Sequence, residues 1–267
     1  MSRSSPTSFP ALMPFIALTR AVSPSIVDCE ITHIDRTPIN VARADRQHLE
    51  YERALAALGC DIRHVEPAPQ HPDAVFIEDT AVVLDEVAVI TRPGADSRRG
   101  ETAGVVAALQ PFRPLVFIEG PGTVDGGDVL VVARRIYVGR TDRTNDDGIA
   151  QLAALTVPFG YTVIPVNVRG CLHLKTAVTA LDDGTVLVNP QWVDAEALAP
   201  LDVVPVHANE PMGANVVRLD DALLYADSYP RTLELLRARG YRVVTVAADE
   251  LAKAEGAVTC CSLLVRV

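Results

Sequence analysis

Pairs of short apolar runs, each pair joined by a polar turn, recur along the chain. VFIEDTAVV and VAVITRPG form the first pair, and GGDVLVVARRIYVGRT, HLKTAVTALDDGTVLVNP and ANVVRLDDALLYADSYP contain three more. Apolar runs of this length on either side of a turn predict β-hairpins, and Asp183-Gly184 is a strong turn signal in the third hairpin. The final run, TCCSLLVRV, predicts a single strand with no partner beside it in the sequence.

Helical patterns follow three of the hairpins. Apolar residues recur at three- and four-residue steps in 97–112, 144–157 and 229–240, which predicts amphipathic helices. Thr144 or Asn145 is placed to cap the second helix, and Gly240 to end the third. Apolar segments that follow, 161–166, 201–206 and 241–246, predict further strands. The repeating unit is therefore a hairpin, a helix and a strand.

The N-terminal portion fits the same unit except for one missing strand. Residues 13–22 predict a strand, 40–60 the longest helix and 61–67 another strand. Pairing the strand of 13–22 with the final strand, 259–267, would complete a fifth unit. The sequence then predicts an α/β fold of five units closed into a ring, and closure removes the sheet edges that an open array would expose.

Polar or reactive residues mark the start of each hairpin at a regular spacing. The markers Glu78, Asp128, His173, Asn215 and Cys260 are separated by 50, 45, 42 and 45 residues, a period typical of a repeated supersecondary unit. In a ring, equivalent positions converge on the axis. We therefore expect carboxylates, an imidazole and a thiol to meet at one end of the molecule.

Composition excludes several classes of function. The 267 residues are 49% hydrophobic, with a net charge of −10 and no polybasic run, so nucleic acid is not an expected partner. No apolar run reaches the roughly 20 residues that span a bilayer, and Pro10 and Pro14 interrupt the N-terminal apolar stretch. We expect a flexible tail at 1–12, a single catalytic domain at 13–267 and, from five cysteines without disulfide spacing, a cytoplasmic location.

The converging residue types indicate a particular chemistry. A thiolate beside an imidazole is a nucleophile with a proton shuttle. Surrounding carboxylates would oppose a thiolate unless the substrate brings positive charge. A guanidinium is a planar cation rich in N–H donors that carboxylates bind well. Attack of Cys260 on a guanidinium carbon is therefore the reaction that these residues favour, and a bound cation would lower the thiol pKa.

Several segments resemble the dimethylarginine dimethylaminohydrolases, within the guanidino-group-modifying enzymes. The matching segments span nearly the whole chain in the family's order: HPDAVFIEDT, ITRPGADSRRGE, PGTVDGGDVL, VGRTDRTN, LHLKT, SYPRT and GAVTCCSL. The resemblance implies the five-bladed pseudo-symmetric α/β propeller of the pentein type, which agrees with the period found above.

The resemblance also implies a role for each matching residue. It implies that Cys260 is the nucleophile, His173 the general acid and base, and Asp125 the carboxylate that orients the histidine. The implied substrate contacts comprise carboxylates for the cationic nitrogens, arginines for the amino-acid end, a lid residue and a backbone carbonyl: Asp73, Glu78 and Asp79, Arg98 and Arg143, Glu30, and Ala254. No cofactor and no metal are implied.

The implied reaction converts Nω-methylated arginine and water to citrulline and dimethylamine or methylamine, through a covalent thiouronium on Cys260. Two departures leave the exact guanidine open: Glu30 stands where some bacterial members carry an apolar residue, and Asp125 is one methylene shorter than the glutamate of others. A deiminase-like hydrolase of arginine or another small guanidine, and a non-catalytic propeller that binds amino acids, remain alternatives. A homodimer is one assembly that the sequence allows.

Overall fold

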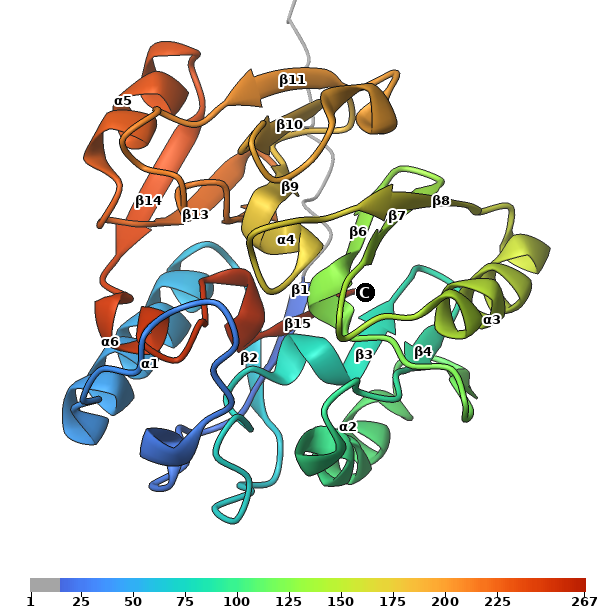
Figure 1. Cartoon of the computed structure of the whole chain (residues 1–267). Helices are drawn as coiled ribbons and strands as arrows, with labels where there is room; N and C mark the ends of the chain where they lie inside the picture. The colour runs from blue at the N-terminus through green and yellow to red at the C-terminus, as the bar shows by residue number, and fades with distance from the viewer. Residues whose placement is uncertain (1–14) are drawn as a thin grey trace, which may run out of the picture.

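Five three-stranded sheets surround a common axis (Figure 1). The structure is a computed structural model that describes residues 15–267; the tail expected at 1–12 lies outside this range. In the order inner, middle and outer, the sheets are β15 (Leu263–Arg266), β1 (Phe15–Thr19) and β2 (Asp61–His64); β3 (Ala81–Val83), β4 (Ala88–Ile90) and β5 (Leu115–Phe117); β6 (Val129–Val132), β7 (Arg135–Arg140) and β8 (Thr162–Asn167); β9 (Val178–Ala180), β10 (Thr185–Val188) and β11 (Asp202–Pro205); and β12 (Val216–Leu219), β13 (Ala222–Ala226) and β14 (Arg242–Val246).

Each sheet has the same internal arrangement, which we call a blade, and blades 1 to 5 follow the order just given. The inner strand is antiparallel to the middle strand, and the outer strand is parallel to it. A parallel pair needs a crossover connection. Four blades supply it with a helix: α1 (Val41–Ala57), α2 (Thr102–Leu109), α3 (Asp146–Thr156) and α5 (Pro230–Ala238). Two further helices, α4 (Leu174–Ala177) and α6 (Asp249–Ala252), are single turns.

The helix ends follow the sequence signals. The Asn145 side chain caps α3 by accepting from the Gly148 backbone N–H. Gly240 follows α5 with a φ of 88°, in the left-handed region that favours glycine at a helix end. Blade 4 is the exception to the repeat, because its crossover carries only a short 3-10 helix at Ala195–Leu198.

The two ends of the described chain share blade 1. β1 pairs with β15 antiparallel, from Phe15 opposite Arg266 to Leu18 opposite Leu263. The expected ring closure is therefore confirmed. Packing closes the ring as well, because five apolar clusters each lie between one pair of neighbouring blades, including blades 5 and 1. Apolar burial of this kind is the main favourable term in folding.

Short helical turns, rather than the strands themselves, carry the polar markers of the repeat. Four of these turns precede the inner strands of blades 2, 3, 4 and 1 respectively: Ile77–Thr80, Gly126–Asp128, α4 and Thr259–Cys261. These residues were expected at strand starts. Asp128 and Asn215 directly precede β6 and β12, whereas Glu78, His173 and Cys260 lie three to five residues before their inner strands. The difference matters because neighbouring side chains diverge strongly in a 3-10 turn, which has three residues per turn.

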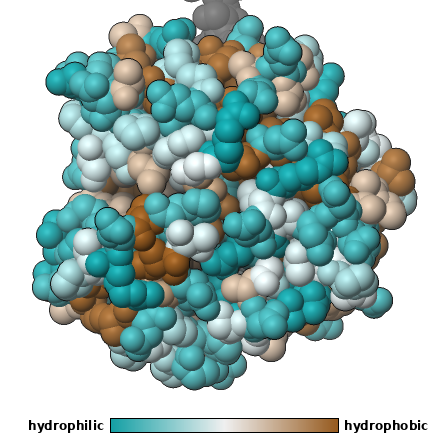
Figure 2. All heavy atoms as spheres, in the orientation of Figure 1, coloured by the Kyte–Doolittle hydropathy of each residue, from teal (hydrophilic) through white to brown (hydrophobic). Residues whose placement is uncertain are grey.

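The surface in this orientation is mostly hydrophilic, with hydrophobic residues in scattered groups (Figure 2). Among the described residues, no helix is both long and apolar enough to cross a bilayer. Inside the ring, the inner strands line a cavity of about 290 Å³ that we call the central cavity.

Candidate active site

A pocket at the hub of the propeller gathers side chains from the turns and connecting loops of blades 1 to 4. We call it the hub pocket. Its polar side chains are Glu30, Asp73, Asp79, Arg98, Arg143, His173, Glu255 and Cys260, and Ala254 also lines it. Residues more than 200 positions apart in the sequence therefore meet here because ring closure brings the first and last turns together.

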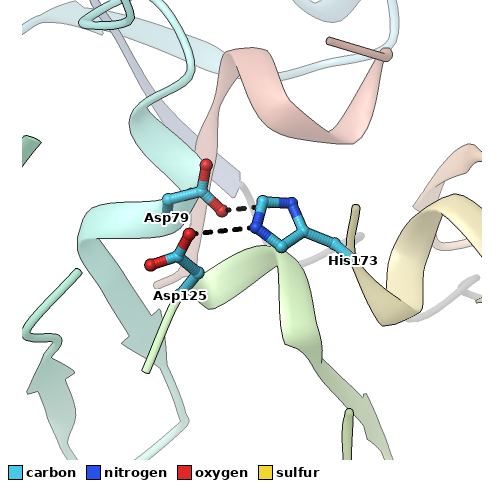
Figure 3. Close-up of side chains that lie close together, drawn as sticks. All are labelled: Asp79, Asp125 and His173. Atoms are coloured by element: carbon cyan, nitrogen blue, oxygen red, sulfur yellow. Dashed lines mark hydrogen bonds and ion pairs between the residues drawn. The ribbon is translucent and has the colours of Figure 1, made fainter. Parts of the chain in front are cut away.

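The carboxylates of Asp79 and Asp125 lie together on one side of the His173 ring (Figure 3). Its Nε2 is 3.0 Å from Asp125 Oδ2, and its Nδ1 is 3.9 Å from Asp79 Oδ1. All three side chains are buried. Gly127 passes so close that a Cβ there would lie 2.6 Å from His173 Nδ1, which explains a glycine at this position. The arrangement holds the imidazole in one orientation.

The carboxylates also set the charge of the imidazole. Burial lowers the pKa of His173, but the nearby Asp79, Asp125 and Asp128 outweigh burial and raise the pKa to about 9. The ring is therefore an imidazolium at neutral pH and carries a proton that it can donate. Asp79 has the converse shift: burial raises its pKa, whereas His173 and Arg98 hold it at about 2.

Cys260 lines the hub pocket with a partly exposed side chain. The Ala257 backbone N–H points at its Sγ from 3.4 Å. Burial first, and then the charges of Glu78 and Asp79, raise the thiol pKa to about 12. The thiol is therefore protonated in the empty pocket. A cation beside Asp79 would offset the negative charge and make the thiolate accessible.

Cys261 differs from Cys260 in its surroundings. It is buried in the apolar cluster between blades 5 and 1, and burial raises its thiol pKa well above the usual range. This placement leaves a single thiol of the pair on the pocket.

Asp73 is the second carboxylate that faces the pocket. It is buried, and its Oδ2 accepts from the Glu30 backbone N–H at 3.1 Å. Burial raises its pKa to about 6 in spite of the opposing charge of Arg98. Asp73 therefore changes from mostly neutral to mostly charged as the pH rises through about 6. A bound cation would favour the charged form.

The two predicted substrate arginines have different environments. The Arg98 guanidinium donates to Asp79, to both carboxylate oxygens of Glu101 and to the Phe76 carbonyl. Arg143 is also buried, but its guanidinium donates to Thr32 Oγ1 at 3.3 Å and forms no ion pair within residues 15–267. Arg143 is therefore the cation with donors left for an anionic ligand, whereas Arg98 orients Asp79.

The segment around Glu30 covers the pocket as a lid. Ser97 donates to the Glu30 carboxylate. Farther along, the backbone N–H groups of Thr32 and His33 both donate to the carboxylate of Glu255, the residue after Ala254. The sequence analysis did not single out Glu255. Its φ of 55° is uncommon for a residue other than glycine, but no sequence pattern marks it.

Glu78 lies apart from the other predicted substrate contacts. Its carboxylate accepts from Lys175 Nζ at 2.6 Å and from Thr259 Oγ1 at 2.7 Å. All three residues line the central cavity rather than the hub pocket. The expected contact between Glu78 and a substrate nitrogen therefore has no geometric support, and Lys175 is the partner that sequence reasoning missed.

Asp79, Asp125 and His173 could each offer a ligand atom, and these atoms lie within 4.8 Å of one another. The same atoms are already engaged: Asp125 bonds His173, and Asp79 accepts from Arg98 and the Gly127 backbone. An imidazolium has no lone pair for a metal. The donor set therefore suits proton transfer better than a resident metal.

Comparisons with known proteins agree on one family. The chain is 46% identical to a dimethylarginine dimethylaminohydrolase of Streptomyces coelicolor over 94% of this chain and 96% of that protein. The chain belongs to the dimethylarginine dimethylaminohydrolase family. A second member, from Pseudomonas aeruginosa, is 34% identical over 92% of this chain and 97% of that protein. No protein-family model matches the chain.

Solved structures of the family have the same fold. A cysteine-to-serine mutant of the P. aeruginosa enzyme in complex with citrulline superposes with a TM-score of 0.87 at 32% identity, covering 95% of this chain and 99% of that one. The N-terminal domain of a cyanobacterial arginine dihydrolase, 21% identical, superposes with a TM-score of 0.84. The second similarity shows the fold alone. The predicted five-bladed propeller is therefore confirmed.

Proposed function

We propose that this protein is a cysteine hydrolase that converts Nω-methylated arginine and water to citrulline and dimethylamine or methylamine. One observation carries the proposal: Cys260 and a protonated His173 line a single pocket that also presents the carboxylates of Asp73 and Asp79 and the unpaired Arg143. Carboxylates at one end and an arginine at another suit a zwitterionic amino acid with a cationic side chain.

Binding activates the nucleophile. Burial, and after it the charges of Glu78 and Asp79, raise the Cys260 thiol pKa to about 12. The guanidinium lies beside Asp79 and Asp73 and offsets the contribution of the acids, so that the thiol can release its proton to solvent. Arg143 receives the substrate carboxylate, and the backbone carbonyl of Ala254 accepts from the α-ammonium group. These contacts fix the guanidinium carbon against the sulfur, and such orientation supplies a large part of many rate enhancements.

The chemical steps then follow from the charges. The Cys260 thiolate forms an S–C bond to the guanidinium carbon, His173 gives its proton to the methylated nitrogen, and the C–N bond breaks to release the amine. A covalent thiouronium remains. The neutral His173 next takes a proton from water, the resulting hydroxide attacks the same carbon, and the C–S bond breaks to return the thiolate. The protonated urea that leaves gives its extra proton to solvent or to the released amine, and citrulline remains. Proton transfer of this kind contributes roughly 10²–10⁴ in rate.

The test measures citrulline and released amine after incubation with dimethylarginine, monomethylarginine and arginine. We expect methylamines from the methylated substrates and no turnover with Cys260→Ser. Ammonia from arginine as the main product would support the deiminase alternative. No product from any guanidine, with normal binding of the amino acids, would support a non-catalytic propeller and overturn the proposal.

A reducing, cytoplasmic compartment suits this chemistry. All five cysteines of the chain are free thiols in the structure, and a nucleophilic thiol keeps its activity only while it stays reduced. Fractionation of the native host cells, followed by detection of the protein in the cytosolic or another fraction, tests the location.

A further inference from the structure

Asn215 occupies the blade 5 position that corresponds to the catalytic turns of the other blades, yet it does not line the hub pocket. Its side chain is buried and its hydrogen-bonding groups are engaged. Nδ2 donates to the Lys175 carbonyl and to Thr259 Oγ1, both at 3.0 Å, and Oδ1 accepts from the Thr259 backbone N–H at 3.0 Å.

The partners of Asn215 stand beside the two reacting groups. Lys175 follows His173 by two residues in the same turn, and Thr259 directly precedes Cys260. One side chain therefore joins the segment that carries the imidazole to the segment that carries the thiol. The two segments lie in blades 4 and 1, which are not neighbours in the ring, so blade 5 spans the gap between them.

The link closes a cycle of hydrogen bonds. Lys175 Nζ and Thr259 Oγ1 both donate to the carboxylate of Glu78, so that Asn215, Lys175, Glu78 and Thr259 form one connected loop at the end of the central cavity. Each member restrains the others, because a shift of any of them would break two bonds in a buried site.

Hydrogen bonds from other side chains connect the turns of blades 2, 3 and 4. Asp79 accepts from the Gly127 backbone N–H at 2.8 Å, which joins blades 2 and 3. Asp128 accepts from the Leu174 backbone N–H at 2.9 Å, which joins blades 3 and 4. Asn215 makes both of the next two joints, from blade 4 to 5 and from 5 to 1. Asn215 therefore connects two pairs of neighbouring blades, whereas each aspartate connects one pair.

An amide is suited to this place for a second reason. It combines donors and an acceptor without charge. A carboxylate here would lose both donations from Nδ2 and would add negative charge next to Cys260, whose pKa the acids Glu78 and Asp79 already raise.

We propose that Asn215 is a positioning residue that holds Cys260 at its working distance and orientation from His173. The proposal rests on the function proposed above, and it extends that function to a residue that need not touch substrate. Misplacement of a reacting group by about 1 Å can reduce a rate by roughly 10²-fold, so the expected effect is on kcat rather than on KM.

The experiment compares Asn215→Ala with Asn189→Ala. Asn189 is a matched control, because it is equally buried and its side chain donates to the Pro211 carbonyl and accepts from the Gln191 backbone N–H, away from the hub pocket. We expect similar losses of Tm in both variants, but a fall in kcat of about 10- to 100-fold only in Asn215→Ala, with KM changed less than about threefold.

Alkylation of Cys260 by iodoacetamide across pH 7–11 is a second readout that needs no turnover. Asn215→Asp retains the shape of the side chain and the bond from the Thr259 N–H, and we expect its alkylation profile to shift to higher pH because the added charge disfavours the thiolate. This variant also tests the proposal if Asn215→Ala does not fold.

The outcomes are decisive in either direction. A kcat for Asn215→Ala within twofold of wild type, an equal loss of kcat in Asn189→Ala, or an unshifted alkylation profile in Asn215→Asp would overturn the positioning role. Absence of turnover by the wild-type protein would contradict the proposed hydrolase instead, and the alkylation profiles would still decide the role of Asn215.

Discussion

The hub pocket and the central cavity lie on opposite sides of one turn, Ile77–Thr80. Each is lined by one of the two acidic residues of that turn. Asp79 faces the pocket with His173 and Arg98, whereas Glu78 faces the cavity with Lys175. In the pocket, Asp79 pairs with Arg98, whereas Asp73 forms no salt bridge within residues 15–267 and is the carboxylate left for a new cation. In the cavity, Glu78 already has its cation. The two adjacent acids therefore differ in role: Asp79 faces the proposed substrate, and Glu78 stabilises the scaffold.

The largest expected effect comes from removing the pocket acid. Asp79→Asn should reduce kcat/KM by about 10² or more, because a preorganised charge at a reacting centre is worth roughly that factor. At the same time, loss of its charge should lower the Cys260 pKa and speed alkylation at pH 8. Steady-state kinetics and iodoacetamide labelling measure the two opposed changes. Retention of kcat/KM within threefold would show that Asp79 has no part in the reaction.

Arg143 tests the amino-acid end of the same pocket. Charge-assisted hydrogen bonds contribute about 1.5–3 kcal/mol, so Arg143→Gln should raise KM for methylated arginine by about 10- to 100-fold. The same guanidine without its carboxylate is the control, and wild type and variant should use it equally well. An equal loss with both substrates would mean that Arg143 acts on the fold rather than on the carboxylate.

The cavity acid should matter less. Glu78→Gln keeps a side chain that can accept from Thr259 but weakens the pair with Lys175, and we expect kcat to fall by roughly tenfold with KM little changed, since the effect is on position. Kinetics beside Asp79→Asn give the comparison directly. A rise in KM as large as that of Arg143→Gln would return Glu78 to the set of substrate contacts.

The smallest effect is a dependence on pH. Asp73 has a pKa of about 6, raised by burial, so it is mostly neutral at pH 5 and mostly charged at pH 7. The charged form attracts the guanidinium, and kcat/KM should therefore rise by about five- to tenfold between these values. Asp73→Asn should flatten the profile. A full rise retained in that variant would assign the dependence to another group, such as Asp128, whose pKa is also about 6.

Periodicity in the sequence was sufficient to predict the fold. The hairpins, the marker spacing and the unpaired strand at 259–267 predicted five units and their closure, because alternation and turn residues act locally. The helix of blade 4 was not predicted, and the structure has only the short turn at Ala195–Leu198 there.

The site was predictable in its members but not in all of their contacts. His173, Asp125, Asp79 and Cys260 converge as the ring geometry requires. The partners of Glu78 could not be anticipated, because the direction of a side chain within a 3-10 turn depends on a backbone that the residue types do not specify. Lys175 is a polar residue beside an apolar strand, and only three-dimensional proximity distinguishes it from an ordinary surface position. Asn215 was a marker of the repeat, but the spacing did not predict its hydrogen-bond partners.

The shared first blade has a consequence for synthesis. Cys260 lies three residues before β15, and β15 completes its sheet only by pairing with β1, which is translated long before it. Cys260 cannot reach its final position until β15 has been translated. A nascent or prematurely terminated chain would therefore hold every other reactive group without the one that attacks, and reactivity would begin only with a finished ring.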